Sequence, residues 1–205
     1  MSSSIIAQSS DTANTKYPIF FLQVGSNRNS FLEKVFQQAA VTNGIENVYI
    51  LTDTDFDLYK DYKCIDITKY INNNSEFDKV YQHHSTNSYQ FEKSCFDRWF
   101  ILKDVVQELN IPYFFYADCD VLVLRDLTPT FNYMIKHGYE GAMTFVDREN
   151  DSISITSAHS SFWGSELLNE FCDFTYNTYT DSHTFNKLLK DTVRGNFTAT
   201  TMYLT

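Results

Sequence analysis

Two aspartates that directly follow an apolar, aromatic run constrain this chain more than any other feature. Residues 113–117 read Tyr-Phe-Phe-Tyr-Ala, and Asp118 and Asp120 come next, separated by one residue. The run suits a strand that is buried on both faces, as strands of parallel sheets are. In open α/β sheets, ligands bind outside the carboxyl ends of the strands, which is where these two acids would lie.

Two carboxylates this close together need a partner, because like charges at short range raise each other's proton affinity. A divalent cation resolves the conflict, and oxygen ligands favour Mg²⁺ or Mn²⁺ over a softer metal. We therefore expect Asp118 and Asp120 to bind Mn²⁺ or Mg²⁺ in a site that can hold a diphosphate. An isolated Asp-x-Asp pattern is most often a solvated turn. The buried strand before this pair, and the apolar residues 121–124 after it, favour the metal site instead.

The alternation of apolar runs along the chain predicts an α/β fold, with a mostly parallel central sheet and helices on both faces. The expected strands are 19–24, 48–51, 113–117, 141–145 and 153–157, with 64–67 as a further candidate. The expected helices are 30–42, 87–110, 128–137, 166–179 and 184–194, the first of them starting with a capping box at residues 30–33. The polar segment 55–88 is expected to form a functional loop or a lid outside the sheet.

Composition and charge exclude several classes of protein. The chain has 205 residues, of which 43% are hydrophobic and 17% aromatic, so it can bury a substantial core as one domain. Its net charge is -10 and it has no basic stripe, which argues against nucleic acid as a partner. An acidic protein that handles an anionic nucleotide needs local charge compensation, so a bound metal ion becomes more favoured.

The two ends of the chain suggest how the domain is bounded. Residues 1–16 are rich in Ser and Thr and are expected to be a disordered tail, so that the domain spans 17–205. The tail lacks the basic head and apolar centre of a signal peptide. Apolar stretches fall far short of the roughly 18 residues that a membrane helix needs, so no transmembrane segment is expected. We therefore expect a cytoplasmic protein.

Residue Arg98 lies on the predicted helix 87–110, which leads directly into the aromatic strand. It stands one residue before Trp99, which belongs to the apolar face of that helix. If Trp99 packs inward, Arg98 borders the buried face and can reach the acids at the end of the next strand. The alternative is a solvated side chain that pairs locally with Asp97 or Glu92.

The order of these elements resembles that of nucleotide-sugar glycosyltransferases with the GT-A fold, which is Rossmann-like. The likeness rests on a strand, a βαβ unit, a long helix, an aromatic strand and the sequence Asp118-Cys119-Asp120. Residues 91–102 (Phe-Glu-Lys-Ser-Cys-Phe-Asp-Arg-Trp-Phe-Ile-Leu) are similar to a helix that precedes the DxD strand in uncharacterised bacterial and viral members. The resemblance covers roughly residues 18–180, and DxD is its only specific motif.

The resemblance implies a metal-dependent, hexosyltransferase-like enzyme of polysaccharide biosynthesis. Such an enzyme transfers a sugar from a nucleotide-diphosphate sugar, here a UDP-sugar in preference to a GDP-sugar, to a glycan or another hydroxyl acceptor. The resemblance implies that Val24, Gly25 and Ser26 line the base and ribose, and that Asp53 contacts the nucleobase. It implies that Asp118 contacts the ribose or the metal shell, that Asp120 binds the metal, and that Arg98 orients these two acids. His159, Ser160 and Trp163 are expected to contact the sugar or the acceptor. Asp147, on an acidic loop, is the candidate general base.

Two other readings stay open. Complete members of the family continue past the point where this chain stops, so it could instead be a truncated, non-catalytic module that binds a nucleotide or a partner. Phosphatases of the haloacid-dehalogenase type also use two aspartates after a buried strand. Their motif lies near the start of the chain and has Gly-Thr after the second Asp, whereas Val121-Leu122 follows here.

Overall fold

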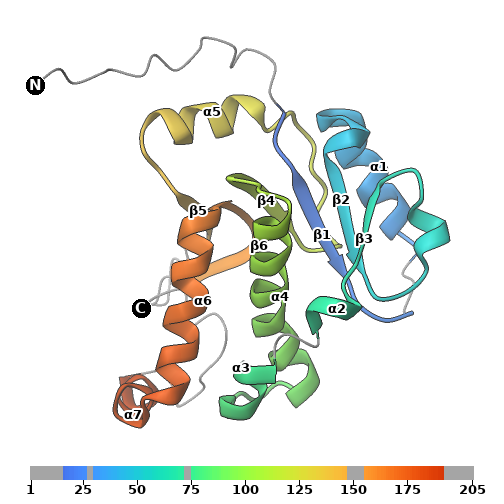
Figure 1. Ribbon diagram of the computed structural model, residues 1–205. Helices are drawn as coiled ribbons and strands as arrows, with labels where there is room; N and C mark the ends of the chain where they lie inside the picture. The colour runs from blue at the N-terminus through green and yellow to red at the C-terminus, as the bar shows by residue number, and fades with distance from the viewer. Residues whose placement is uncertain (1–15, 27–29, 72–74, 147–154, 192–205) are drawn as a thin grey trace, which may run out of the picture.

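A computed structural model describes residues 16–26, 30–71, 75–146 and 155–191 of the chain. Its strands form a six-stranded sheet in the order β3-β2-β1-β4-β6-β5 (Figure 1). The strands are β1 (Ile19–Gln23), β2 (Val48–Thr52), β3 (Lys63–Asp66), β4 (Tyr113–Ala117), β5 (Gly141–Val146) and β6 (Ile155–Gly164). The helices are α1 (Leu32–Asn43), α2 (Thr68–Ile71), α3 (Ser75–Val80), α4 (Tyr89–Glu108), α5 (Thr128–Lys136), α6 (Ser165–Thr180) and α7 (Ser182–Asp191), with the short 3-10 helices η2 (Ile45–Asn47) and η3 (Phe56–Tyr59).

The sheet is mostly parallel, as the sequence predicts. Strands β3, β2, β1 and β4 pair with one another in parallel, whereas β6 runs antiparallel to both of its neighbours, β4 and β5. From β1 the chain proceeds to β2 and β3 on one side, and it then returns through α4 to place β4 on the other side of β1. The strand order therefore changes direction between β1 and β4. This is the point at which open α/β sheets bind their ligands.

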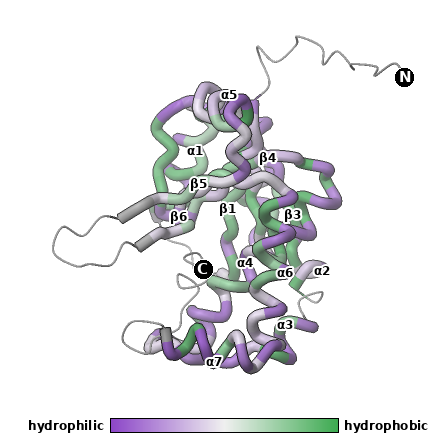
Figure 2. The backbone as a smooth tube through the Cα atoms, turned by 90° about the vertical axis from the view of Figure 1, so that its left-hand side faces the viewer, coloured by the Kyte–Doolittle hydropathy of each residue, from purple (hydrophilic) through white to green (hydrophobic). Residues whose placement is uncertain are grey.

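Helices cover both faces of the sheet and form a separate core on each. Along β1 the side chains of Ile19 and Phe21 pack on the face covered by α1, whereas Phe20 packs on the face covered by α4 and α6. Figure 1 shows α4 and α6 lying side by side over that second face. Figure 2 shows a mostly hydrophobic β1 and, at the periphery, an α7 in which hydrophilic and hydrophobic residues alternate. The expectation of helices on both faces is confirmed.

The segment 55–88 corrects one expectation from the sequence. It is not a lid outside the sheet, because it contributes the edge strand β3 and the helices α2 and α3. Its side chains Ile67, Tyr70 and Phe77 are at most 4% exposed and belong to the core beneath α4. Burial of such side chains contributes roughly 1.5–3 kcal/mol each. The sequence did not predict the helices of this segment, because its apolar residues are few and spread over several short elements without a helical periodicity.

Two local expectations also differ from the structure. Helix α1 has Phe31 as its N-cap residue and no side-chain cap hydrogen bond, so the capping box expected at residues 30–33 does not form. Strand β6 continues to Gly164, whereas the sequence suggested that a strand ends at residue 157. Serine and histidine residues in the middle of β6 interrupt its apolar pattern, which explains the early end.

The expected tail and the last part of the domain lie mostly outside the described residues. Residues 1–15 and 192–205 are not described, and Asp147 lies in another such range, 147–154. Lys16, the first described residue, pairs with Asp126. Within the described part of the chain, no helix is long and apolar enough to cross a membrane.

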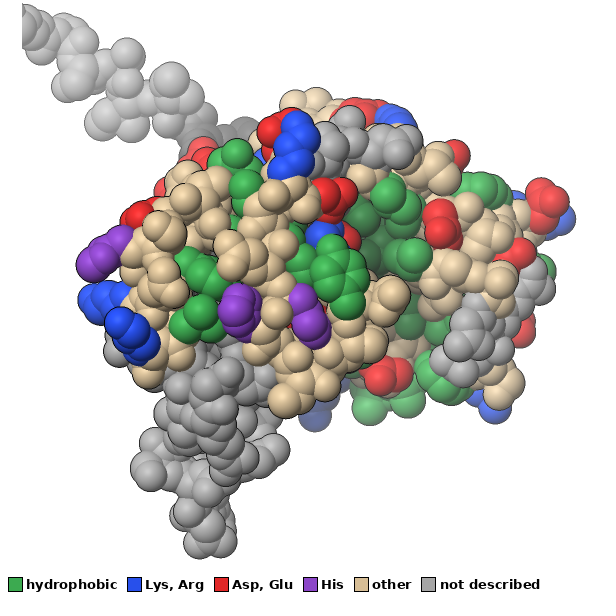
Figure 3. All heavy atoms as spheres, turned by 90° about the horizontal axis from the view of Figure 1, so that it is seen from below, with side chains coloured by type: hydrophobic (Ala, Val, Ile, Leu, Met, Phe, Trp, Pro, Cys, Tyr) green, Lys and Arg blue, Asp and Glu red, His purple; other side chains and the backbone are tan. Residues whose placement is uncertain are grey.

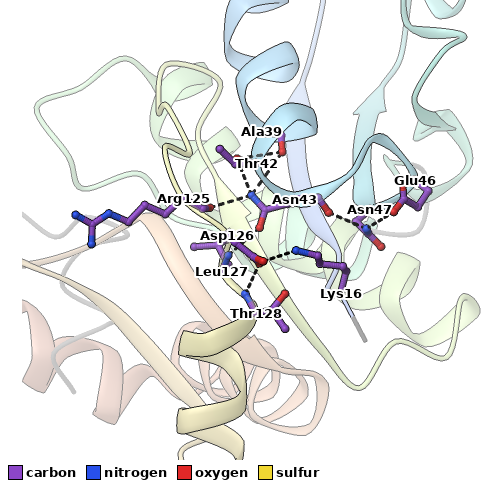
Figure 4. A network of polar contacts seen from close by, with 10 residues as sticks. All are labelled: Lys16, Ala39, Thr42, Asn43, Glu46, Asn47, Arg125, Asp126, Leu127 and Thr128. Atoms are coloured by element: carbon purple, nitrogen blue, oxygen red, sulfur yellow. Dashed lines mark hydrogen bonds and ion pairs between the residues drawn. The ribbon is translucent and has the colours of Figure 1, made fainter. Parts of the chain in front are cut away.

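A hydrogen-bonded junction between the end of α1 and residues 123–127 holds the segment that follows the two aspartates (Figure 4). The side chain of Asn43 is buried; its Oδ1 accepts a hydrogen bond from the Leu127 N–H at 2.8 Å, and its Nδ2 donates to the Arg125 carbonyl at 3.1 Å. Thr42 Oγ1 donates to the Val123 carbonyl at 2.9 Å. The Asn43 side chain thus supplies hydrogen bonds to backbone groups of residues 125 and 127, which lie outside the sheet.

We expect Asn43→Ala to lower the free energy of unfolding by about 2 kcal/mol, because the Leu127 N–H and the Arg125 carbonyl lose their partner. Urea denaturation followed by circular dichroism measures this. The matched control is Asn47→Ala in η2, just after α1, where the side chain bonds the Asn43 carbonyl and Glu46 in a more exposed position. Equal losses in the two variants would contradict a specific role for Asn43.

A second polar cluster joins α3 to α4, the helix that carries Arg98. Lys93 has a side chain only 11% exposed, pairs with both Asp78 and Asp97, and lies 5.4 Å from the centre of the Phe77 ring. Burial alone would lower the pKa of Lys93, but its bonds to the two carboxylates raise that pKa above its ordinary value of 10.5. The folded state therefore favours the charged lysine.

Lys93→Met should lower the free energy of unfolding by about 2 kcal/mol at neutral pH, because the partly buried Asp97 loses its cation. The lost pair with Asp78 adds little, because that carboxylate is half exposed. The raised pKa means that the lysine's contribution is present below pH 10.5 and is lost as the pH rises through the folded-state value. The difference in the free energy of unfolding between wild type and variant should therefore become smaller in urea titrations at alkaline pH. Lys69→Met, at an exposed pair with Glu108, is the control and should change little. A gap that grows with pH would contradict this assignment.

Candidate functional site

The two aspartates lie at the change of strand direction between β1 and β4. Asp118 follows β4 immediately, and its N–H donates to the His159 carbonyl of β6 at 2.8 Å. A pocket of about 340 Å³ opens at this end of the sheet. It is lined by Leu22, Gln23, Val24, Phe31, Leu32, Ser94, Arg98, Tyr116, Asp118, Cys119 and Asp120. Figure 3 views the molecule from below, the end toward which β1 runs in Figure 1, and shows basic and acidic side chains beside hydrophobic ones around a hollow.

Arg98 reaches across from α4 and fixes the carboxylate of Asp118. Its Nη1 donates to Asp118 Oδ1 at 2.6 Å, and the hydroxyl of Tyr116 donates to the same oxygen at 2.6 Å. Arg98 Nη1 also lies 3.1 Å from the Tyr116 hydroxyl, which closes a triangle of polar groups. The exposed fractions are 17% for the Arg98 side chain and 32% for that of Asp118. The contact that the sequence predicted between Arg98 and the acids is present, and its role in ligand binding stays a prediction.

Asp120 differs from Asp118 in its surroundings. Its side chain is exposed, and within the described residues it has no hydrogen bond or ion pair. The carboxylate of Asp118 is already matched by a guanidinium, whereas that of Asp120 is free to bind a cation. Mg²⁺ and similar ions are often held by one or two carboxylates, with phosphate and water oxygens completing the coordination.

The described residues contain no group of three or more His, Cys, Asp or Glu side chains that could hold a metal alone. The donor set nevertheless fits a cation that is bound together with a ligand. Asp120 offers a free carboxylate, and Asp118 offers Oδ2, because the Arg98 and Tyr116 donors both bind Oδ1. Both carboxylates line a pocket large enough for a further group. A cation here would need water oxygens, or the oxygens of a diphosphate, to complete its shell.

Cys119 and Tyr116, which flank Asp118 on either side, are both kept protonated. Burial raises the pKa of the Cys119 thiol to about 12, and the neighbouring Asp118 and Asp120 carboxylates add to the effect. Burial also raises the pKa of Tyr116 well above its ordinary value. Cys119 Sγ donates to the Leu22 carbonyl at 3.3 Å and so ties the end of β4 to β1. The residue between the two acids is therefore structural in this arrangement.

The loop after β1 is held by the residue after β2. The Gly25 N–H donates to Asp53 Oδ1 at 2.7 Å, and Gly25 has a φ of 76°, which an L residue with a side chain adopts at a cost. Val24 is half exposed and lines the pocket, and Ser26 is exposed next to Gly25. Four of the residues expected to contact the nucleotide thus meet at two adjacent strand ends. The contact of Asp53 with a nucleobase stays a prediction.

The three residues of β6 that were expected to contact the sugar or the acceptor lie in different surroundings. His159 adjoins Asp118 through its carbonyl, and its Nδ1 lies 2.7 Å from Ser157 Oγ. Ser160 lies instead over a separate apolar pocket beside α5, with its Oγ 2.9 Å from Thr144 Oγ1. Trp163 is 1% exposed and packs on Trp99 in the core. Trp163 therefore belongs to the core and does not line the pocket, and its contact with a sugar or acceptor stays a prediction.

Tyr116 and Phe31 are among the pocket residues that sequence reasoning missed. Tyr116 could have been found, because residues two apart on a strand point to the same face, and Asp118 follows it at that spacing. Phe31 is 41% exposed at the start of α1 and lines the pocket across from Arg98 and Ser94 of α4. Nothing in its local sequence separates it from an ordinary residue at a helix start.

The comparisons with known proteins bear on the fold. No protein-family model matches the chain, and no curated protein matches it in sequence. Among solved structures it is similar to mouse xyloside xylosyltransferase 1 in its apo form, with a TM-score of 0.59 and 10% identity over 92% of this chain and 80% of that chain. A weaker match is a glycosyltransferase involved in the glycosylation of the major capsid of PBCV-1, with a TM-score of 0.45, 12% identity, and 80% and 68% of the two chains covered.

A third solved structure, CMP:2-keto-3-deoxy-manno-octonic acid synthetase complexed with CTP, matches with a TM-score of 0.48 and 11% identity over 86% of each chain. At such identities a likeness shows the fold alone. The chain has an α/β fold with a mixed, mostly parallel six-stranded sheet flanked by helices, and this fold is similar to that of the xylosyltransferase.

Proposed function

We propose that this protein is a metal-dependent glycosyltransferase that transfers a sugar from a nucleotide-diphosphate sugar to a hydroxyl acceptor. The observation that carries the proposal is the pairing of a fixed Asp118 with a free Asp120 at the change of strand direction. The fold similarity to a xylosyltransferase supports the reaction class. A UDP-sugar is the favoured donor, a GDP-sugar the alternative, and a glycan the favoured acceptor.

The charges of the pocket argue for a cation that enters with the nucleotide. The protein carries a net charge of -10, and Arg98 is the one basic side chain among the described residues that line the pocket. Arg98 is already paired with Asp118, so it cannot alone compensate a diphosphate placed beside two carboxylates. Asp120 would hold a Mn²⁺ or Mg²⁺ ion, whose charge would offset this repulsion.

Each part of the pocket has a role in this proposal. Asp120 would hold the cation, and Asp118 would contact the ribose or the metal shell from its fixed position. Phe31 offers an exposed ring on which a base can stack, and Val24 lies beside it in the same pocket. Asp53 would act by holding the Gly25 turn that shapes this side of the pocket.

The chemistry follows from where negative charge develops. The metal, when bound, would stabilise the charge on the departing nucleoside diphosphate as a Lewis acid. Asp118 would help to orient the nucleoside diphosphate, because Arg98 fixes its carboxylate. Helix α4 carries Arg98, and Asp118 directly follows β4. Asp147 is proposed as the general base for the acceptor hydroxyl, and it lies outside the described residues.

We expect UDP to bind the wild-type protein at least tenfold more tightly with Mn²⁺ than with a chelator, as measured by isothermal titration calorimetry, because the diphosphate completes the metal shell. Asp120→Asn should remove most of this metal-dependent gain, since it deletes the free carboxylate.

The matched control is Asp126→Asn, which alters a carboxylate of the same segment that pairs with Lys16 and lies outside the pocket. It should leave the metal-dependent gain unchanged. Equal UDP affinity with and without chelator in the wild-type protein would overturn the metal role. Metal-dependent binding without turnover of any UDP- or GDP-sugar would favour the non-catalytic module over the enzyme.

A further inference from the structure

The hydroxyl of Tyr116 makes a contact that the core does not require. The Tyr116 ring is 2% exposed and packs edge-on against Trp99, with ring centroids 5.0 Å apart. These ring contacts would be the same for phenylalanine. The hydroxyl is placed at the rim of that core, where it bonds Asp118 Oδ1 at 2.6 Å and lies 3.1 Å from Arg98 Nη1.

Two donors therefore converge on one oxygen of the carboxylate. Arg98 Nη1 and the Tyr116 hydroxyl both donate to Oδ1 of Asp118, each at 2.6 Å. A carboxylate offers about four lone-pair sites on its two oxygens, so Oδ1 is saturated and Oδ2 remains as the oxygen for a ligand. Two donors in different directions also stop rotation of the carboxylate about its χ2 bond, which is otherwise a soft torsion.

We infer that Tyr116 is a positioning residue, which acts with Arg98 to fix the Asp118 carboxylate so that Oδ2 alone meets the cation or nucleotide. This inference rests on the proposed function, because it assigns the ligand of the same pocket. Arg98 supplies a charged donor to Oδ1, and Tyr116 supplies a second donor from another direction, which sets the carboxylate plane. Groups that orient a ligand in this way typically change metal affinity by 10–100-fold when they are removed.

The test compares two Tyr→Phe changes in the same strand. Tyr116→Phe removes the hydroxyl and keeps the ring against Trp99. Tyr113→Phe, three residues earlier in β4, is the matched control, because its ring stacks on Phe162 at a centroid distance of 5.8 Å and it does not line the pocket. Mn²⁺ binding without nucleotide is followed by electron paramagnetic resonance, and UDP binding in Mn²⁺ by calorimetry.

Tyr116→Phe should weaken Mn²⁺ affinity and Mn²⁺-dependent UDP affinity by about tenfold. UDP affinity in chelator and the melting temperature should change little, the latter by about 3 °C at most. Tyr113→Phe should match the wild type in all four measurements. A purely structural role for Tyr116 would lower the melting temperature and leave the metal dependence of UDP binding intact.

The outcomes separate this inference from the function on which it rests. Metal-dependent UDP binding in the wild type, with the same affinities in Tyr116→Phe, would overturn the positioning role and leave the proposed function standing. A wild-type protein that binds neither Mn²⁺ nor UDP would overturn both. If Tyr116→Phe does not fold, Arg98→Lys replaces the planar guanidinium with a flexible ammonium while it keeps every core ring. Unchanged Mn²⁺ affinity in that variant would equally overturn the inference.

Discussion

The ion pair between Arg98 and Asp118 links helix α4, on the second face of the sheet, to the end of β4, the strand beside β1. Two mostly buried charges are tolerated in a folded protein only if they are paired and hydrogen-bonded, because their desolvation is otherwise costly. The core beneath α4, built on Phe20, Trp99 and Tyr116, sets the distance across which the pair forms. Helix position, strand position and carboxylate orientation are therefore coupled through one contact.

The site around this pair is assembled from elements that lie far apart in the sequence. Its walls come from the end of β1, the start of α1, the middle of α4 and the end of β4. Three further contacts hold these parts together: Cys119 binds the Leu22 carbonyl, Asp53 holds Gly25, and Asn43 holds the segment after Asp120. A site whose parts are fixed by partly buried polar contacts needs less reorganisation when a ligand binds.

The sequence allowed the sheet, its long helix and the acid pair to be predicted, because each rests on a strong local pattern. The strand Tyr113–Ala117 is a continuous apolar run, and α4 shows a broad apolar face. The contact of Arg98 with Asp118 could be predicted because one short connection joins their elements. The helices α2 and α3 were missed because Tyr70 and Phe77 are isolated apolar residues in a polar segment. The core position of Trp163 was not predicted, because its tertiary partner, Trp99, cannot be read from its neighbours in sequence.

The central claim is that a cation and a nucleotide meet between the ends of β1 and β4. Amide NMR spectra of ¹⁵N-labelled protein with UDP and substoichiometric Mn²⁺ test it most directly, because the paramagnetic ion broadens only nearby signals. The account predicts that the signals of Gly25, Cys119 and Val121 broaden first, and that those of α7 stay sharp. Broadening centred on another acidic surface, such as Asp55–Asp61 beside η3, or no selective broadening at all, would contradict it.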